Sequence, residues 1–203
     1  AAAAKTRSLT LGGLFLNDAV AELKDKELTM AVGNGRAGKF SIAETEFANL
    51  YSRDLRVRYS PGTLSITAPG ATSASMTTPD FKLEGLKGQN LRVTDVGRTT
   101  RVQLDGLTAD AATLKDNRAR GVKADTFELT DVPERTDIRL GNLRADTVTA
   151  PGTTITGVTA PEVLINDDPI YTRINSDQVR VAKIEGGGAI LGNLNIAGVR
   201  LTI

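Results

Sequence analysis

A phrase that returns every 36 residues constrains this chain more than any other feature of it. Four similar segments, LKGQNLRV, VKADTFEL, VTAPEVLI and LNIAGVRL, begin 36 residues apart, at Leu86, Val122, Val158 and Leu194. A second series interleaves with the first at 21 and then 15 residues and begins at Leu107, Leu143 and Val179. A fixed period of this size is typical of stacked units that bury their apolar faces only against their neighbours. The repeat therefore predicts an extended repeat protein, and it says little about chemistry.

The apolar pattern within each unit indicates β-strands. From residue 40 onward, apolar residues occur in pairs two apart, such as Leu91 with Val93 and Phe127 with Leu129. This spacing places both side chains on one face of a strand. Within each phrase the parity of the apolar positions changes, which requires the backbone to turn or bulge. A Gly or Asn residue, which can adopt a positive φ, precedes many of the units. These residues are Gly85, Gly106, Gly121, Asn142, Gly157 and Asn193.

Two all-β architectures fit this pattern. The favoured one is a β-solenoid, in which short strands and two-residue corners wrap the core in a 36-residue super-repeat of 21- and 15-residue units. The alternative is a rolled antiparallel β-groove or a jelly roll. In that alternative the 21/15 alternation reflects up and down strands, and bulges explain the parity changes.

The first part of the chain is predicted to be distinct from the rest. We expect an N-terminal cap with a β-hairpin over residues 1–39 and a repetitive β domain over 40–203. Residues 14–30 suit two strands joined by a turn at 24–26 better than a helix, because the tight-turn signal Asn34-Gly35 follows. The opening AAAAKTR resembles the end left by a secretory signal, and it equally suits a cloning remnant or a tail.

Composition excludes several classes of function. The chain has no Cys and no His, which removes disulfides, thiol catalysis and the commonest general base. Its 25 basic and 24 acidic residues give a net charge of +1, without the signature of nucleic-acid binding. No stretch has the roughly 18 consecutive apolar residues of a transmembrane span. We therefore expect a protein that is not an enzyme, needs no cofactor and binds no nucleic acid.

Two resemblances bear on fold and location. The A-D-T-[FV] corners at 124–127 and 145–148 resemble those of bacterial β-helix proteins, which implies a solenoid that is periplasmic, surface-exposed or secreted. Residues 64–93 resemble the β-groove repeats of lipopolysaccharide-transport and AsmA-like envelope proteins, which implies a folded sheet with a lipid-handling trough. The residues that carry this second resemblance are Leu64, Ile66, Ala68, Leu83, Gly85, Leu86 and Leu91. The strict 36-residue regularity departs from that pattern.

Repeated aspartates are the only candidate metal ligands. Asp95, Asp131 and Asp167 recur at intervals of 36 residues, and Asp110 and Asp146 form a second row. Stacked carboxylates can bind Ca²⁺, which requires six to eight oxygen ligands. Asp also favours turns through local hydrogen bonds to the backbone, and we expect that role here. No metal site is therefore assigned, and the first row is kept as a calcium candidate.

The apolar end of the chain suggests an interaction site. The last phrase has no polar cap, and exposed strand edges tend to pair with other chains. We expect contacts with protein partners, or self-association, through Leu194, Ile196, Val199, Leu201 and Ile203. The expected function is that of an extracytoplasmic, non-enzymatic scaffold or assembly module. Alternatives are a lipid-handling groove and a viral fibre or appendage module, with lipid or polysaccharide as a further candidate partner.

Overall fold

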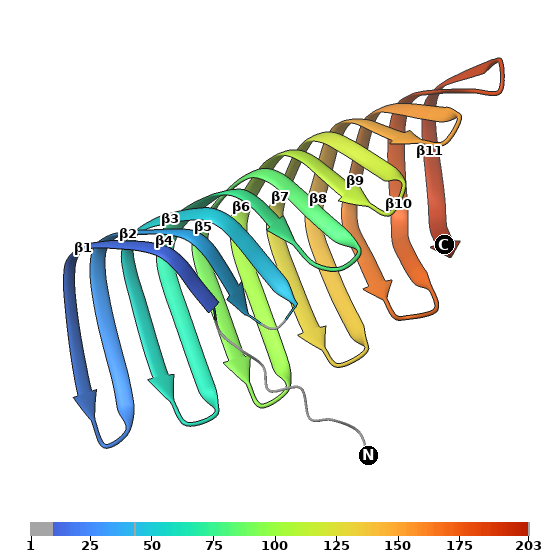
Figure 1. The fold of residues 1–203 in the computed structure, drawn as a ribbon. Coiled ribbons are helices and arrows are strands. Elements are labelled where there is room, and N and C mark those ends of the chain that lie inside the picture. Colours follow the sequence, from blue (N-terminus) through green and yellow to red (C-terminus); the bar gives the residue numbers. More distant parts are fainter. Residues whose placement is uncertain (1–9, 43, 203) are drawn as a thin grey trace.

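The computed structural model describes residues 10–42 and 44–202, which form a single antiparallel sheet of eleven strands in sequence order (Figure 1). Each strand from β2 to β10 pairs with the strand before it and the strand after it in the chain. The strands are β1 (Thr10–Lys24), β2 (Glu27–Ile42), β3 (Thr45–Ser60), β4 (Thr63–Thr77), β5 (Phe81–Val96), β6 (Thr99–Leu114), β7 (Asn117–Val132), β8 (Arg135–Ala150), β9 (Thr153–Asp167), β10 (Thr172–Gly186) and β11 (Ala189–Thr202). The described part of the chain contains no helix that could cross a bilayer.

The prediction of a β-solenoid is wrong, because successive strands are antiparallel and follow one another across an open sheet. The antiparallel alternative is correct in strand direction, although the order is a simple meander and not that of a jelly roll. The 36-residue period corresponds to one hairpin, that is, two strands of 14–16 residues with their turns. The parity changes that suggested corners between short strands are kinks inside long strands.

Residues with positive φ produce these kinks. Each odd-numbered strand has one at the same point of the repeat, with φ between 51° and 64°, at Gly13, Asn49, Gly85, Gly121, Gly157 and Asn193. All six Gly and Asn positions expected to need a positive φ have one, so that prediction is confirmed. A left-handed residue in a strand forms a bulge that shifts the following side chains to the other face.

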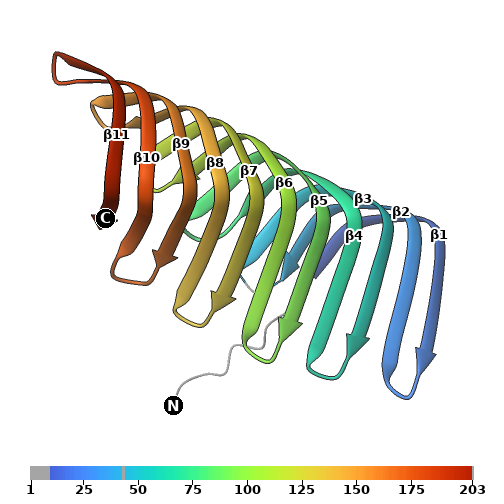
Figure 2. The same ribbon diagram turned by 180° about the vertical axis from the view of Figure 1, so that it is seen from behind.

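These kinks lie about a third of the way along the odd-numbered strands, and the whole sheet folds lengthwise into two arms (Figures 1 and 2). We call the arm that carries the turns after β2, β4, β6, β8 and β10 the first arm. The second arm carries the turns after β1, β3, β5, β7 and β9. The inner faces of both arms look toward each other across the fold.

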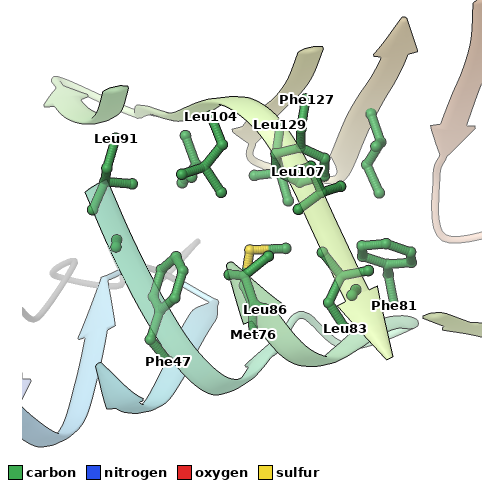
Figure 3. Close-up of a cluster of buried hydrophobic side chains, with 14 of the residues drawn as sticks. Phe47, Met76, Phe81, Leu83, Leu86, Leu91, Leu104, Leu107, Phe127 and Leu129 are labelled. Carbon is green, nitrogen blue, oxygen red and sulfur yellow. The ribbon is translucent and has the colours of Figure 1, made fainter. Parts of the chain in front are cut away.

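The space between the arms is filled with apolar side chains over the central strands. Phe127, Leu104 and Leu129 lie on one side of this core, and Met76 and Leu83 lie on the other (Figure 3). All five are at most 1% exposed. The side chains that alternate with these core residues point to the outer face and carry the charges. Glu84, for example, forms ion pairs with Lys82 and Arg118 there. The sheet is therefore amphipathic across its thickness.

The N-terminal segment joins the same sheet. Residues 14–30 form parts of two strands joined at Asp25 and Lys26, as predicted. The tight turn predicted at Asn34-Gly35 is wrong, since both residues lie within β2 and pair with β1. A continuous strand forms here in place of the turn because the neighbouring repeats set the strand length. Gly35 occupies an inner position on β2. The boundary between residues 39 and 40 stays a prediction, and β2 spans it.

Candidate functional site

The arms leave an apolar cavity of about 90 Å³ between them near the β1 end of the sheet. Both arms contribute to its lining, which includes Leu14, Leu16, Met30, Ala37, Phe40, Phe47, Leu50, Leu55, Val57, Leu64, Ile66, Leu91 and Val93. Leu14 is 48% exposed on the edge strand, whereas Phe47 at the other side of the cavity is 1% exposed. The cavity therefore reaches from the packed core toward β1 at the edge of the described sheet.

Gly35 leaves one wall of the cavity open. A Cβ placed on this residue would meet only ordinary van der Waals contacts, 3.5 Å from Cδ2 of Leu55 and 3.7 Å from Cδ2 of Leu16. Its φ is not in the left-handed region, so the backbone does not require glycine there. Sequence reasoning assigned Gly35 to a turn and missed this role. A glycine inside a strand can instead mark a place where a ligand or another backbone approaches closely, and that was the available signal.

The chemistry of the cavity suits an alkyl chain. Arg36 is the one charged residue among the described residues that line it, and the lining hydroxyl of Ser52 already donates to the carbonyl of Gly70 at 2.8 Å. A cavity of roughly 150 Å³ lined by aliphatic and aromatic side chains holds a benzene molecule. The smaller cavity here has room for the end of an alkyl chain, and the rest of that chain would extend toward β1.

The predicted interaction residues at the end of the chain lie together on β11. Leu194 faces Val181, Ile196 faces Val179 and Leu201 faces Ile174 across the β10–β11 ladder, so these side chains continue the inner face. Val199 faces the buried Ser176 in the same row. Ile196 is 37% exposed and Leu201 is 52% exposed, because β11 is the last strand of the sheet in the described part of the chain. Ile203 lies outside the described residues.

The structure places the calcium candidates Asp95, Asp131 and Asp167 in one cross-strand row on the inner side of the second arm. A threonine separates each from the next, because Thr100 pairs with both Asp95 and Asp131, and Thr136 pairs with both Asp131 and Asp167. Two strand spacings put successive carboxylates about 9–10 Å apart. The described residues hold no group of three acidic side chains arranged for a metal ion.

Each of these aspartates accepts a hydrogen bond from the threonine that follows it in the chain. Thr100 donates to Asp95 at 2.8 Å, Thr136 donates to Asp131 at 3.3 Å and Thr172 donates to Asp167 at 2.5 Å. Each pair closes the end of a hairpin, where the two strands of a repeat meet. The partners in these hydrogen bonds are threonine hydroxyls and not the backbone groups that we expected for the row.

The second row of aspartates lies over the kinks. A Cβ on Gly85 would overlap Oδ2 of Asp110, and a Cβ on Gly121 would overlap Oδ2 of Asp146. At the next repeat Ala182 takes the place of the aspartate, 2.8 Å from a Cβ on Gly157. These glycines are therefore required both by their positive φ and by the side chain above them. This second row of aspartates therefore has a structural role.

The pKa of Asp167 is also affected by a carboxylate from another hairpin. Burial raises the pKa of Asp167, and the neighbouring carboxylate of Asp80, in the turn between β4 and β5, raises it further against the opposing hydrogen bond from Thr172. The pKa of the adjacent Asp168 is lowered, because its carboxylate accepts hydrogen bonds from the amides of Tyr171 at 2.8 Å and Ile170 at 3.0 Å. Two sequential aspartates thus have shifts of opposite sign.

Replacement of Asp167 by asparagine is expected to stabilise the protein at pH 7. Because the pKa of Asp167 is raised in the folded state, the folded protein keeps this proton where the unfolded chain has released it. That contribution to stability is full below the ordinary value of 3.8 and is lost as pH rises through the folded pKa. Chemical denaturation of the Asp167→Asn variant should show a gain at pH 7 that vanishes near pH 3. Asp168→Asn is the control, with a loss of stability at pH 7, and a loss for both variants would contradict the assignment.

No family model, curated protein or solved structure matches the chain. The resemblances to β-helix proteins and to β-groove repeats therefore stay predictions. The functional argument depends on the cavity and the exposed strand edges of the chain itself.

Proposed function

We propose that this protein handles lipid by sheltering an acyl chain in the apolar cavity between the arms at the β1 end of the sheet. The observation that carries the proposal is an aliphatic and aromatic cavity of about 90 Å³ that reaches the exposed Leu14. The open antiparallel sheet supports it, since the inner faces of both arms can contact one chain from two sides. The resemblance to envelope groove proteins supports an extracytoplasmic location as part of the same proposal.

The packed middle of the molecule limits where the ligand lies. Leu104, Leu129 and Phe127 are at most 1% exposed, so the core side chains already occupy the space between the arms there. Met30, Leu50 and Val57 at the β1 end are only partly buried. We infer that the chain end enters at β1 and stops at the packed core, while the polar head group stays in solvent.

A fluorescent fatty acid tests the proposal. Dansyl-labelled undecanoic acid is expected to bind the purified protein saturably, with a blue shift and enhancement of its emission. The Gly35→Leu variant fills the cavity, and it should weaken affinity about tenfold. This estimate corresponds to exclusion of about two methylenes at about 0.8 kcal/mol each.

The matched control is Gly12→Leu, in the strand that pairs with β2. Gly12 also lacks a positive φ, and a Cβ there lies 3.6 Å from Cβ of the exposed Lys39, on the outer face. This variant should bind the probe like the parent protein. Binding that is not saturable, or that is equally strong in the Gly35→Leu variant, would contradict an acyl site in the cavity.

The exposed edge strands favour a second candidate function, assembly with another protein through an edge of the sheet. β1 and β11 each pair on one side only within the described chain. The 14-residue β11 exposes Ile190, Leu191 and Leu201 by more than half of their surface. A long, apolar edge with unpaired backbone groups is a ready template for another strand.

A further inference from the structure

We propose that β11 pairs antiparallel with β11 of a second copy of this chain, about a two-fold axis that passes through Asn195. The inference rests on the second candidate function, assembly through a sheet edge. It names the partner strand and its register.

The apolar pattern of β11 is the same in both directions when read from Asn195. Its inner-face residues are those opposite the inner residues of β10, namely Ala189, Leu191, Leu194, Ile196, Val199 and Leu201. In the proposed register Leu194 lies opposite Ile196 of the second copy. Likewise Leu191 lies opposite Val199, and Ala189 opposite Leu201. Every inner side chain of one copy therefore meets an inner side chain of the other, and the apolar face continues across the interface.

The kinks of the two copies lie close to each other in this register. β11 has positive φ at Asn193, 55°, and at Gly198, 65°. The two-fold axis through Asn195 places Asn193 opposite Ala197, and Gly198 opposite Gly192, so each kink of one copy lies one residue away from alignment with a kink of the other. The fold line of the sheet can then pass from one copy to the next. β10 contains no residue with positive φ and still pairs with β11 along both arms, so the preference for a second β11 rests on the apolar pattern.

Charge favours β11 over the other edge of the sheet. Arg200 is the only charged residue of β11, and it falls opposite Ile190 of the second copy, so no like charges meet. β1 has three charged residues, Asp18, Glu22 and Lys24. Charged side chains on an edge strand discourage pairing with another chain. The two edges therefore differ, and the pairing is assigned to β11.

Cysteine cross-linking tests the register, since the natural chain has no Cys. In the Asn195→Cys variant the two introduced thiols lie on the symmetry axis. Opposite residues of an antiparallel pair have Cα atoms about 4.5–5.5 Å apart, within the range of a disulfide. Mild oxidation should therefore yield covalent dimers. In the matched Ala197→Cys variant the two thiols lie four residues out of register, about 13 Å apart, and should cross-link at least tenfold more slowly.

Sedimentation velocity over a concentration series tests the interface without a cross-link. The parent chain is expected to form a dimer that dissociates on dilution. Ile196→Lys, which places a lysine opposite Leu194 at both symmetry-related positions, should be monomeric. Val20→Lys, at a 72% exposed position on β1, should remain dimeric.

Two results would overturn the proposal in different ways. A dimer that survives Ile196→Lys, or that cross-links as fast at position 197 as at 195, would reject the β11 pairing and leave assembly through another edge standing. A parent chain that is monomeric at every concentration would reject self-pairing together with the second candidate function for the isolated protein.

Discussion

Truncation of Phe127 to alanine is expected to lower the free energy of unfolding by about 3–5 kcal/mol, the usual range for a fully buried phenylalanine. Phe127 is 0% exposed and lies between Leu104 of β6 and Leu140 of β8 in the central part of the sheet. Removal of the ring leaves a cavity between two arms that are held apart by many other core side chains, so little collapse can compensate. Urea denaturation followed by circular dichroism measures the loss.

Phe15→Ala is the matched control for this prediction. The same truncation on β1 removes a ring that is 68% exposed, and its effect should stay within about 0.5 kcal/mol. If the Phe127→Ala variant lost less than about 1 kcal/mol, the interior would not be packed around β7 in solution. The apolar space would then run along the whole fold, and the acyl site would extend beyond the β1 end.

Replacement of Gly85 by alanine is expected to cost about 2–3 kcal/mol. A non-glycine residue in the left-handed region costs roughly 1–2 kcal/mol, and Gly85 has φ of 63°. The new Cβ would also overlap the carboxylate of Asp110, which must leave its rotamer at a further cost of about 0.5–1.5 kcal/mol. The same denaturation experiment measures the sum of the two effects.

Variants at Gly106 and Asp110 separate the cost of the left-handed backbone from the cost of the overlap with Asp110. Gly106 has φ of 56° and open space around its Cβ position, so Gly106→Ala should show only the backbone cost. In the Gly85→Ala background, truncation of Asp110 to alanine should recover the part that comes from the overlap. A Gly85→Ala variant no less stable than Gly106→Ala would contradict the close approach of Asp110 to the kink.

Much of the fold could be predicted from the sequence because the repeat, the strand character and the kinks leave local signals. The i, i+2 pairs such as Leu91 and Val93 place side chains on one face, and Gly or Asn before most of the units marks the positive φ. The connection between strands was assigned incorrectly. The apolar pattern changes parity in the same way whether a strand turns a corner or forms a bulge. The periodicity of a strand also does not indicate which strand it pairs with.

The candidate site was harder to predict for a similar reason. Gly35 shapes the cavity through the absence of a side chain, and its neighbour Asn34 made the pair look like a turn. The cavity itself depends on how closely the two arms approach at the β1 end, which is a long-range property. The inner residues of β11 could be selected from the sequence, because Leu194, Ile196 and Leu201 form an apolar run without a polar cap.

The strictly sequential order of the strands also determines how the length of this protein can change. Each hydrogen-bonded neighbour in the sheet is also a neighbour in the chain, so stability is close to a sum of local terms and folding can start on any hairpin. Insertion or deletion of 36 residues adds or removes one hairpin and leaves every kink and inner side chain in register. A change of 18 residues would join two strands that point the same way through a two-residue turn, which parallel strands do not permit. The hairpin is therefore the smallest unit by which such a molecule can be lengthened or shortened.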